Sequence, residues 1–156
     1  MIKLITAYTE DRLIGKGDQL PWKIDEELNF FKNQTLGKII VMGDTTFKGL
    51  PGPLPERKTI VLTLDKSWSY EHKDVEVIYS IEDFMEKYQN SDEEAFICGG
   101  ATIYKLLLPF AKEIIISHIK GKYIGDVYFP EWDVTEYDKE VILEEKQFTA
   151  IKYTKK

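Results

Sequence analysis

One glutamate stands in a setting that could change its acid strength. Glu27 follows Trp22 by five residues, and Phe30 and Phe31 come three and four residues after it. In a helix these residues share one face, so the carboxylate would be carried into an apolar neighbourhood. Desolvation raises the pKa of a carboxyl group towards neutrality, which a proton donor at physiological pH requires. The alternative is an ordinary solvated acid in the first turn of a helix.

Two predicted strand-to-helix turns carry residues suited to a phosphate. They read Met42-Gly43-Asp44-Thr45-Thr46 and Cys98-Gly99-Gly100-Ala101-Thr102. In open α/β sheets, ligands lie at the carboxyl ends of strands, where helix N-termini offer free amides and glycine lets the backbone approach closely. A Gly-Gly pair alone is a weak signal, but the two turns together indicate a dinucleotide lying across the sheet edge.

Arg57 is a candidate anchor for an acidic ligand. It follows the proline-rich run at residues 51–55 and is not expected to lie in a helix. Because a guanidinium can pair with a carboxylate through two parallel hydrogen bonds, Arg57 suits the acidic tail of a substrate. A surface arginine without such a partner is at least as good an interpretation.

The helix that carries Glu27 is expected to begin with Asp25 as its N-cap and to end near Thr35-Leu36-Gly37. A long loop, residues 9–22, leads into this helix. Loops of this length in compact domains are usually lids or binding loops. The acid is therefore expected at the end of a functional loop.

Apolar, β-branched runs predict six strands, at residues 2–8, 38–43, 58–63, 75–79, 95–98 and 113–119. Helices are expected from Asp44, from Ser80 as N-cap with Asp83 in its first turn, and over residues 101–110. Strand–helix–strand order favours parallel pairing, whereas residues 138–143 and 148–153 are close enough to pair antiparallel. The predicted fold class is α/β, with a mixed, mainly parallel central sheet of about eight strands, antiparallel C-terminal strands and flanking helices.

The composition excludes several classes of protein. A chain of 156 residues is expected to form one domain, residues 1–156. The net charge of −6, from 21 basic and 27 acidic residues, argues against a nucleic-acid or membrane partner. One cysteine excludes an internal disulfide, and with two histidines it cannot form an ordinary zinc site, so no metal is expected. Without a signal peptide or a membrane-spanning run, the expected location is the cytoplasm.

The order of the motifs resembles dihydrofolate reductase over essentially the whole chain. In sequence, they are Ala7 in the first strand, Ile14-Gly15, Leu20-Pro21-Trp22, the acid five residues beyond the tryptophan, Met42-Gly43 with Thr46, Pro53-Leu54-Pro55 with Arg57, Gly99-Gly100 with Ile103-Tyr104, and Gly125-Asp126 with Phe129-Pro130. Each motif alone is weak, whereas the ordered series is specific.

The resemblance implies an oxidoreductase that reduces 7,8-dihydrofolate to 5,6,7,8-tetrahydrofolate, with NADPH giving a hydride to C6 and a proton reaching N5. Such an enzyme supplies one-carbon metabolism, including thymidylate and purine synthesis, and is a target of antifolate inhibitors. The resemblance is also consistent with a protein that acts as a monomer in the cytoplasm and binds only small molecules.

The resemblance further implies roles for individual residues. Glu27 would bind the pterin and promote protonation of N5 through a water held by Trp22, and Ser117 stands where the family usually has a threonine that bonds this acid. Leu20 lies in the mobile loop, which Asp126 supports. Arg57 would clamp the α-carboxylate of the glutamate tail. The other residues of the folate pocket would be Ile5, Ala7, Leu28, Phe31, Leu50, Leu54 and Cys98. The cofactor would lie against Ala7, Ile14, Gly15, Gly43, Asp44, Thr45, Thr46, Thr63, Leu64, Cys98, Gly99, Gly100, Ala101, Thr102, Ile103 and Tyr104.

The chain departs from the family pattern where the 2′-phosphate of NADPH would bind. Basic residues are usual there, whereas this chain has Asp44 and Asp65, with Thr63, Lys66 and Thr102 as candidate compensating donors. Two acids would repel a phosphate dianion. We therefore expect NADPH to be used with weaker discrimination against NADH than is usual, and a preference of about a thousandfold or more would refute this. Alternatively, Asp44 points to solvent without effect.

Two competing functions are compatible with the same fold. One is a nucleotide- or pterin-binding module without activity, in which Glu27 would be a bystander. The other is the reductase of riboflavin synthesis, which is not expected to pair Trp22 with an acid on the first helix.

Overall fold

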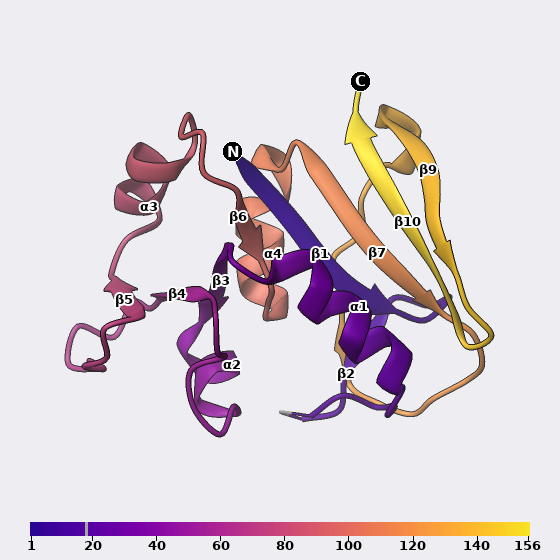
Figure 1. Ribbon diagram of the computed structural model, residues 1–156, viewed down its shortest axis with the longest axis horizontal. Coiled ribbons are helices and arrows are strands. Elements are labelled where there is room, and N and C mark those ends of the chain that lie inside the picture. The colour runs from indigo at the N-terminus through magenta and orange to yellow at the C-terminus, as the bar shows by residue number, and fades with distance from the viewer. Residues whose placement is uncertain (18) are drawn as a thin grey trace.

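The centre of the protein is an eight-stranded sheet (Figure 1). Its strands are β1 (Ile2–Tyr8), β3 (Ile39–Gly43), β4 (Lys58–Leu62), β5 (Val75–Ile78), β6 (Ala95–Ile97), β7 (Glu113–Ile119), β9 (Tyr137–Glu144) and β10 (Phe148–Lys155). The computed structural model describes residues 1–17 and 19–156, and their strand order across the sheet is β5-β4-β3-β6-β1-β7-β10-β9. β10 runs antiparallel to β7 and β9, and the other neighbours are parallel. The predicted mixed, mainly parallel sheet is confirmed.

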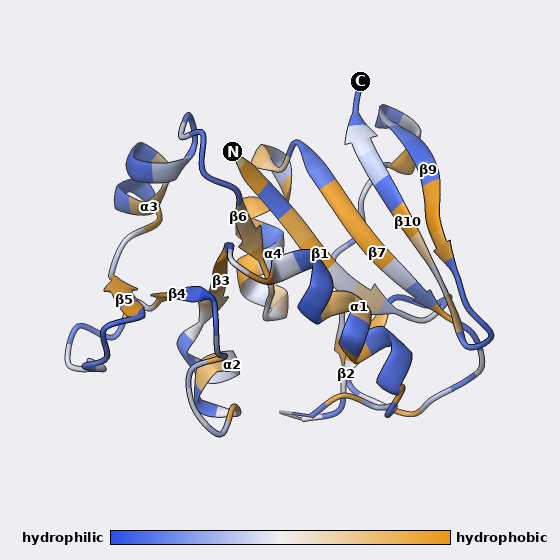
Figure 2. Ribbon diagram, viewed as in Figure 1, coloured by the Kyte–Doolittle hydropathy of each residue, from blue (hydrophilic) through white to orange (hydrophobic). Residues whose placement is uncertain are grey.

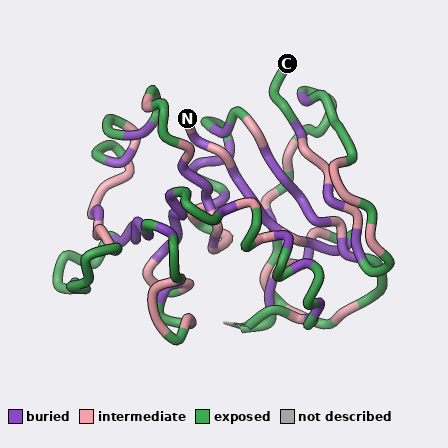
Figure 3. The backbone as a smooth tube through the Cα atoms, viewed as in Figure 1, coloured by how far each residue is buried: buried purple, intermediate pink, exposed green. Residues whose placement is uncertain are grey.

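Helices cover both faces of this sheet. They are α1 (Asp25–Thr35), α2 (Asp44–Lys48), α3 (Ile81–Tyr88) and α4 (Ala101–Leu107). Successive residues of a strand point to opposite faces. In β7, Ile114 belongs to the same core as Phe84 of α3, whereas Ile115 belongs to a second core with Phe30 of α1 and Phe47 of α2. The central strands are accordingly hydrophobic and buried, while the outer turns of α1 and α3 are polar and exposed (Figures 2 and 3).

The helix that carries Glu27 begins one residue earlier than predicted. Ile24 is its N-cap, and Asp25, the predicted cap, is the first helical residue. No side chain caps the helix, but Asp25, Glu26 and Glu27 place three acids in its first turn, where the helix dipole favours negative charge. The predicted end near Thr35 is confirmed. The shift leaves Glu27 and Phe30 on the buried face.

One strand of a second, two-stranded sheet lies within the predicted loop at residues 9–22. Its strands are β2 (Leu13–Gly15) and β8 (Val127–Tyr128), which pair antiparallel. We predicted no strand in either segment, because strands of three and two residues show no periodicity in the sequence. The pairing ties the loop before α1 to the segment after β7.

Local interactions explain where two other helices begin or end. The Ser80 hydroxyl accepts a hydrogen bond from the Asp83 N–H at 3.0 Å, so the predicted N-cap of α3 is confirmed. The predicted helix at residues 101–110 divides into α4 and a 3-10 turn at Leu108–Phe110, where Pro109 lacks the N–H that a continuous helix needs. Among the described residues, no helix combines the length and apolar character needed to cross a membrane.

Candidate active site

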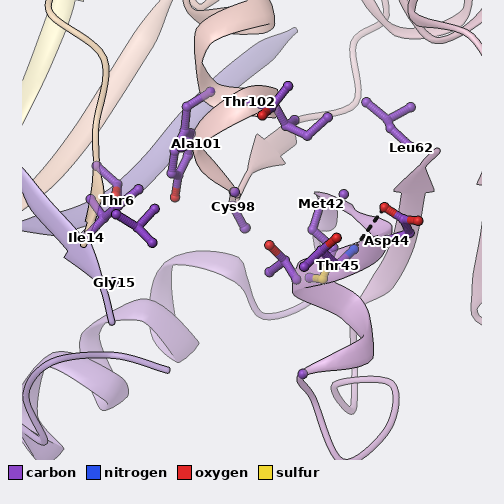
Figure 4. A pocket seen from close by; sticks show the side chains of 18 of the residues that line it. Thr6, Ile14, Gly15, Met42, Asp44, Thr45, Leu62, Cys98, Ala101 and Thr102 are labelled. Atoms are coloured by element: carbon purple, nitrogen blue, oxygen red, sulfur yellow. Dashed lines mark hydrogen bonds between the residues drawn. The ribbon is translucent and has the colours of Figure 1, made fainter. Parts of the chain in front are cut away.

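A cavity of about 900 Å³ opens at the carboxyl ends of the parallel strands. It is lined by Ala7 of β1, Gly43 of β3, Thr63 after β4 and Cys98 after β6. Figure 4 shows the side chains of β1, β2, β3 and the α4 turn around this space. The cavity lies at the sheet edge where the sequence predicted ligands to bind, and its volume is typical of sites for small organic ligands.

The cavity brings together most residues that the sequence singled out. All sixteen candidate cofactor residues line it, from Ala7 to Tyr104, as do Leu20, Ile5, Glu27, Leu28, Phe31, Leu50 and Leu54. Trp22, Arg57 and Ser117 do not line it. Trp22 instead lines a smaller adjoining recess, which shares Leu20, Glu27 and Leu28 with the main cavity.

Glu27 is the buried acid of the site. It is 7 % exposed and lines both the cavity and the adjoining recess. Burial raises the pKa of Glu27 above its ordinary value, and the nearby Ser117 hydroxyl opposes part of that rise. The alternative interpretation, that Glu27 is an ordinary solvated acid in the first turn of the helix, is therefore wrong. A carboxyl group with a raised pKa can hold a proton closer to neutral pH.

Two polar atoms near this acid lack partners among the described residues. They are Nε1 of Trp22 and Oγ of Ser117, both of them buried. The Trp22 ring is fixed by an edge contact with Tyr123, whose ring centroid lies 5.6 Å away. A buried polar group without a partner is costly, so such groups usually meet a ligand or an ordered water. The recess beside Glu27 therefore has in Trp22 a donor suited to a bound polar group, whereas Ser117 lines neither the recess nor the cavity.

The two glycine-containing turns lie against each other. The Gly43 N–H donates to the Gly99 carbonyl at 2.9 Å. A Cβ atom on Gly100 would stand 3.2 Å from Oγ1 of Thr46, and one on Gly43 would stand 3.2 Å from Cγ1 of Ile103. Side chains at these positions would fill the gap between the turns. Glycine thus keeps the backbone of both turns open to the cavity.

Arg57 is buried beside the site and does not lie free on the surface. Only 8 % of it is exposed. Its Nε donates to the Pro55 carbonyl at 3.0 Å and its Nη1 donates to Oγ1 of Thr35 at 3.2 Å. The interpretation as a surface arginine is wrong. These contacts fix the orientation of the guanidinium at the C-terminal end of α1.

The loop before α1 is held by the segment around Asp126. The Gly17 N–H donates to Oδ1 of Asp126 at 2.8 Å, and the Asp126 N–H donates to the Gly15 carbonyl at 3.0 Å. Leu20, further along the loop, lines the cavity and is 50 % exposed. Asp126 therefore supports the loop that borders the cavity.

The charged residues of the cavity are all acidic. The described lining contains Glu27, Asp44 and Asp65 but no lysine, arginine or histidine. Asp44 does not simply point to solvent, because its Oδ2 accepts a hydrogen bond from Thr63 Oγ1 at 3.2 Å. Thr63, a candidate compensating donor, is thus already engaged by Asp44, and the described lining includes Thr102 but not Lys66.

The Cys98 thiol contributes little to the chemistry of this site. Burial raises the pKa of the Cys98 thiol to about 12, so the thiol stays protonated and behaves as a small apolar group. In residues 1–17 and 19–156, no group of three or more His, Cys, Asp or Glu side chains is arranged to hold a metal ion.

Several lining residues were not identified from the sequence. They are Thr6, Gly17, Gln19, Gly49, Leu62, Ile78, Tyr79, Ser80, Ile81, Leu106 and Val127. The segment 78–81 follows β5, so the rule that ligands bind at strand ends could have found it. The contribution of Val127 depends on the short β2–β8 pairing, which the sequence does not reveal.

Comparison with known proteins gives one consistent family. The family model for dihydrofolate reductase matches residues 1–154. Similar relatives are the dihydrofolate reductases of Staphylococcus haemolyticus, 36 % identical over 92 % of this chain and 84 % of the relative, and of Mycoplasma pneumoniae, 37 % identical over 90 % of this chain and 91 % of the relative. A solved dihydrofolate reductase from Enterococcus faecalis, complexed with NADP(H) and RAB-propyl, superimposes with a TM-score of 0.86 at 31 % identity, covering 99 % of this chain and 96 % of the other.

Proposed function

We propose that this chain, which belongs to the dihydrofolate reductase family, catalyses the NADPH-dependent reduction of 7,8-dihydrofolate to 5,6,7,8-tetrahydrofolate. The observation that carries the proposal is the place of Glu27, buried in the wall of the cavity that Gly99 and Gly100 also line. An acid able to hold a proton and a backbone surface open to a dinucleotide thus border one cleft. The product would serve one-carbon metabolism, including thymidylate and purine synthesis.

The cavity fits the cofactor that the family requires. Its volume of about 900 Å³ suits two small-molecule ligands side by side, and the turns at Gly43 and Gly99–Gly100 leave the room that side chains would fill. When bound, NADPH supplies the hydride for C6 of the substrate. The backbone of the two turns would hold its phosphates, and Ala7, Ile14 and Tyr104 would border its reacting end.

Glu27 would bind the pterin ring and supply protons. Its carboxyl group can accept hydrogen bonds from the amino and ring N–H groups of the pterin. Because burial raises its pKa, it would also keep a proton available for N5 through a water molecule. The unpartnered Nε1 of Trp22 would position that water, and the Ser117 hydroxyl would orient the carboxyl group.

The remainder of the substrate would lie along an apolar wall. Ile5, Leu28, Phe31, Leu50 and Leu54 line this part of the cavity. Arg57 would pair with the α-carboxylate of the glutamate tail, since Thr35 and Pro55 already fix two of its donor groups and leave the rest of the guanidinium for a ligand. Antifolate inhibitors of similar shape would occupy the same place.

We also propose the domain organisation, the oligomeric state and the location of the protein. We assign all of residues 1–156 to one domain, because both hydrophobic cores share the strands of one sheet. The protein would act as a monomer in the cytoplasm. Its net charge of −6 supports small-molecule partners rather than nucleic acid or an anionic membrane.

The direct test is an absorbance assay at the band of the reduced nicotinamide. NADPH should be consumed when dihydrofolate is added, and not when the ribosylaminopyrimidine substrate of riboflavin synthesis replaces it. Consumption with the aminopyrimidine alone would replace this function with the riboflavin one. Tight cofactor binding without turnover of either substrate would indicate a binding module.

A further inference from the structure

The cofactor part of the cavity has an acidic end. Asp44 begins α2 directly after β3, and Asp65 lies just beyond β4; both line the cavity. Glu27, the other acid of the described lining, lies on α1 near Ser117, which pairs with Ala7 of β1. Since no described lining residue is a lysine, arginine or histidine, no cation of the cavity wall balances Asp44 and Asp65.

The order of the strands indicates which part of a dinucleotide reaches these acids. From β1 the sheet continues through β6 and β3 to β4, with about 4.8 Å between neighbouring strands. The nicotinamide ring would lie near Glu27 and the pyrophosphate at the turns after β6 and β3. The adenosine of an extended dinucleotide then reaches the end of β4. The adenosine ribose therefore lies beside Asp44 and Asp65.

The carboxylate of Asp44 is held in place by two hydrogen bonds. Oδ2 accepts from Thr63 Oγ1 at 3.2 Å, and Oδ1 accepts from the Thr45 N–H at 2.9 Å, the bond drawn in Figure 4. The Asp65 N–H donates to the same Thr63 oxygen at 3.1 Å, which fixes the hydroxyl as a donor to Asp44. The threonine therefore joins the two acidic residues into one rigid unit.

The carboxylate of Asp65 stays charged at neutral pH. Its Oδ1 accepts hydrogen bonds from the Ser67 N–H at 3.0 Å and from the Ser67 hydroxyl at 2.5 Å. These bonds lower the pKa of Asp65 below its ordinary value. Asp65 is thus an acceptor and a fixed negative charge, and it cannot donate to a phosphate.

A lysine beside Asp44 is shared with a tryptophan ring. Nζ of Lys48 lies 3.5 Å from Oδ2 of Asp44 and 5.6 Å from the ring centroid of Trp68. Lys48 offsets one of the two carboxylates at most, so this end keeps negative charge. A 2′-phosphate carries close to two negative charges at neutral pH, whereas a 2′-hydroxyl carries none and can donate to a carboxylate.

We propose that Asp44 and Asp65 weaken the selection for a 2′-phosphate at this end of the cavity, so that the chain uses NADH as well as NADPH and prefers NADPH by less than a hundredfold. The inference rests on the proposed function and concerns the choice of cofactor within it. A carboxylate beside the ribose accepts a hydrogen bond from the 2′-hydroxyl, which is how acidic residues select the unphosphorylated dinucleotide in other nucleotide sites. The same carboxylates repel the phosphate.

The test compares specificity constants and dissociation constants. For the wild-type protein, kcat/KM for NADPH should exceed that for NADH by less than a hundredfold, and the Kd values of NADP⁺ and NAD⁺ measured by calorimetry should agree within the same limit. The double variant Asp44→Asn with Asp65→Asn should shift both ratios towards the phosphorylated cofactor by at least fivefold. Higher salt should shift the wild-type ratios in the same direction, because it screens the repulsion.

Asp133→Asn is the matched control. Asp133 accepts from the N–H and the hydroxyl of Thr135, as Asp65 does from Ser67, but it does not line the cavity. This variant should leave both ratios within twofold of wild type. A wild-type preference of a hundredfold or more for the phosphorylated cofactor would overturn the inference, as would a double variant that shifts the ratios by less than fivefold. If neither cofactor is oxidised with dihydrofolate, the proposed function fails, and the calorimetric Kd ratios still decide the cofactor preference.

Discussion

At the scale of single residues, the site depends on what surrounds each polar group. The spacing of Glu27, Phe30 and Phe31 indicated a desolvated acid as one of two interpretations, because helical geometry fixes which residues are neighbours. The burial of Glu27 decides between them. The contribution of Ser117 could be stated only by family resemblance, since it comes from a strand ninety positions later. The burial of Arg57 could not be predicted, because it depends on a hydroxyl at the end of another element.

Burial of Glu27 should make the free protein less stable at high pH. Because its folded pKa is raised, the protonated form is favoured in the folded state. Its contribution to stability is complete below the unfolded pKa and is lost as the pH rises through the folded pKa. We expect Glu27→Gln to raise the free energy of unfolding at pH 8 by about 1 kcal/mol, the low end of the cost of burying an unpaired polar group.

Urea denaturation of the ligand-free protein at pH 5 and pH 8 measures this effect. The stabilisation by Glu27→Gln should be larger at pH 8. The control Glu26→Gln changes the same charge at an exposed position of the same turn. Equal effects of the two substitutions at both pH values would show that Glu27 is not desolvated.

Thr35 should act as a positioning residue for Arg57. Its Oγ1 donates to the Phe31 carbonyl at 2.8 Å and accepts from Arg57 Nη1 at 3.2 Å. Thr35→Val keeps the shape and removes this acceptor, so we expect KM for dihydrofolate to rise about fivefold with kcat unchanged, as the loss of one hydrogen bond of about 1 kcal/mol predicts.

Steady-state kinetics separates this role from a general loss of structure. Thr35→Ser keeps the hydroxyl and should restore most of the wild-type KM. A substrate analogue without the glutamate tail should have the same KM with all three proteins. An unchanged KM in Thr35→Val would exclude the positioning role.

At the scale of elements, the sequence predicted long elements better than short ones. The seven residues of β1 and of β7 form apolar runs that identify them as strands, and their predicted bounds are confirmed. The strands β2 and β8 were missed because their pairing depends on contacts 112 to 115 positions apart, between Leu13 and Tyr128 and between Gly15 and Val127. The cap of α1 was misplaced by one residue because Asp25 suits both the cap and the first turn.

Gly125 should be essential for the pairing of β2 with β8. A Cβ atom there would stand 2.4 Å from the Gly15 carbonyl oxygen, and backbone atoms cannot move aside easily. We expect Gly125→Ala to displace the loop that carries Leu20, to lower the free energy of unfolding by about 1–3 kcal/mol, and to reduce turnover. Thermal unfolding and steady-state kinetics measure both effects.

Gly52→Ala is the control for this substitution. A Cβ at Gly52 meets no atom within 4 Å, and Gly52 does not line the cavity. This variant should unfold and turn over like wild type. A Gly125→Ala protein with wild-type stability and kinetics would mean that the two-stranded sheet does not hold the loop in place.

At the scale of the whole molecule, the carboxyl ends of the parallel strands border the cavity and the amino ends carry ion pairs. The cavity lies at the carboxyl ends. At the opposite ends, Glu94 before β6 forms ion pairs with Lys3 of β1 and Lys38 before β3, and Lys3 also pairs with Glu113 of β7 at 3.3 Å. These bonds join four strands of the sheet. The sequence shows where each strand begins and ends, so it predicted the end at which the cavity lies. It does not show which strands are neighbours, so the ion pairs at the opposite end could not be predicted.

Glu94 should support stability without affecting the reaction. Its lysine partners lower its pKa to about 2, so its contribution is present above pH 5 and is lost as the pH falls towards 2. We expect Glu94→Gln to lower the free energy of unfolding at pH 7 by about 1 kcal/mol, because the group is partly exposed and solvent screens the pairs.

Urea denaturation at pH 7 and pH 3, with kinetics at pH 7, checks this expectation. The difference between Glu94→Gln and wild type should become smaller at pH 3, while kcat/KM at pH 7 stays unchanged. A loss of activity in Glu94→Gln without a loss of stability would contradict this division between the two ends of the sheet.

The most direct measurement of the central claim is the pH dependence of dihydrofolate reduction with saturating NADPH, compared for wild type, Glu27→Gln and Glu26→Gln. If the buried acid supplies the proton, the wild-type rate falls as the pH rises through the raised pKa of Glu27. Glu27→Gln should then lose about a hundredfold or more of the rate at pH 7, together with that titration, as expected when a general acid is removed. Glu26→Gln should follow the wild-type curve. A Glu27→Gln protein that keeps the wild-type rate and pH profile would contradict the role given to this acid.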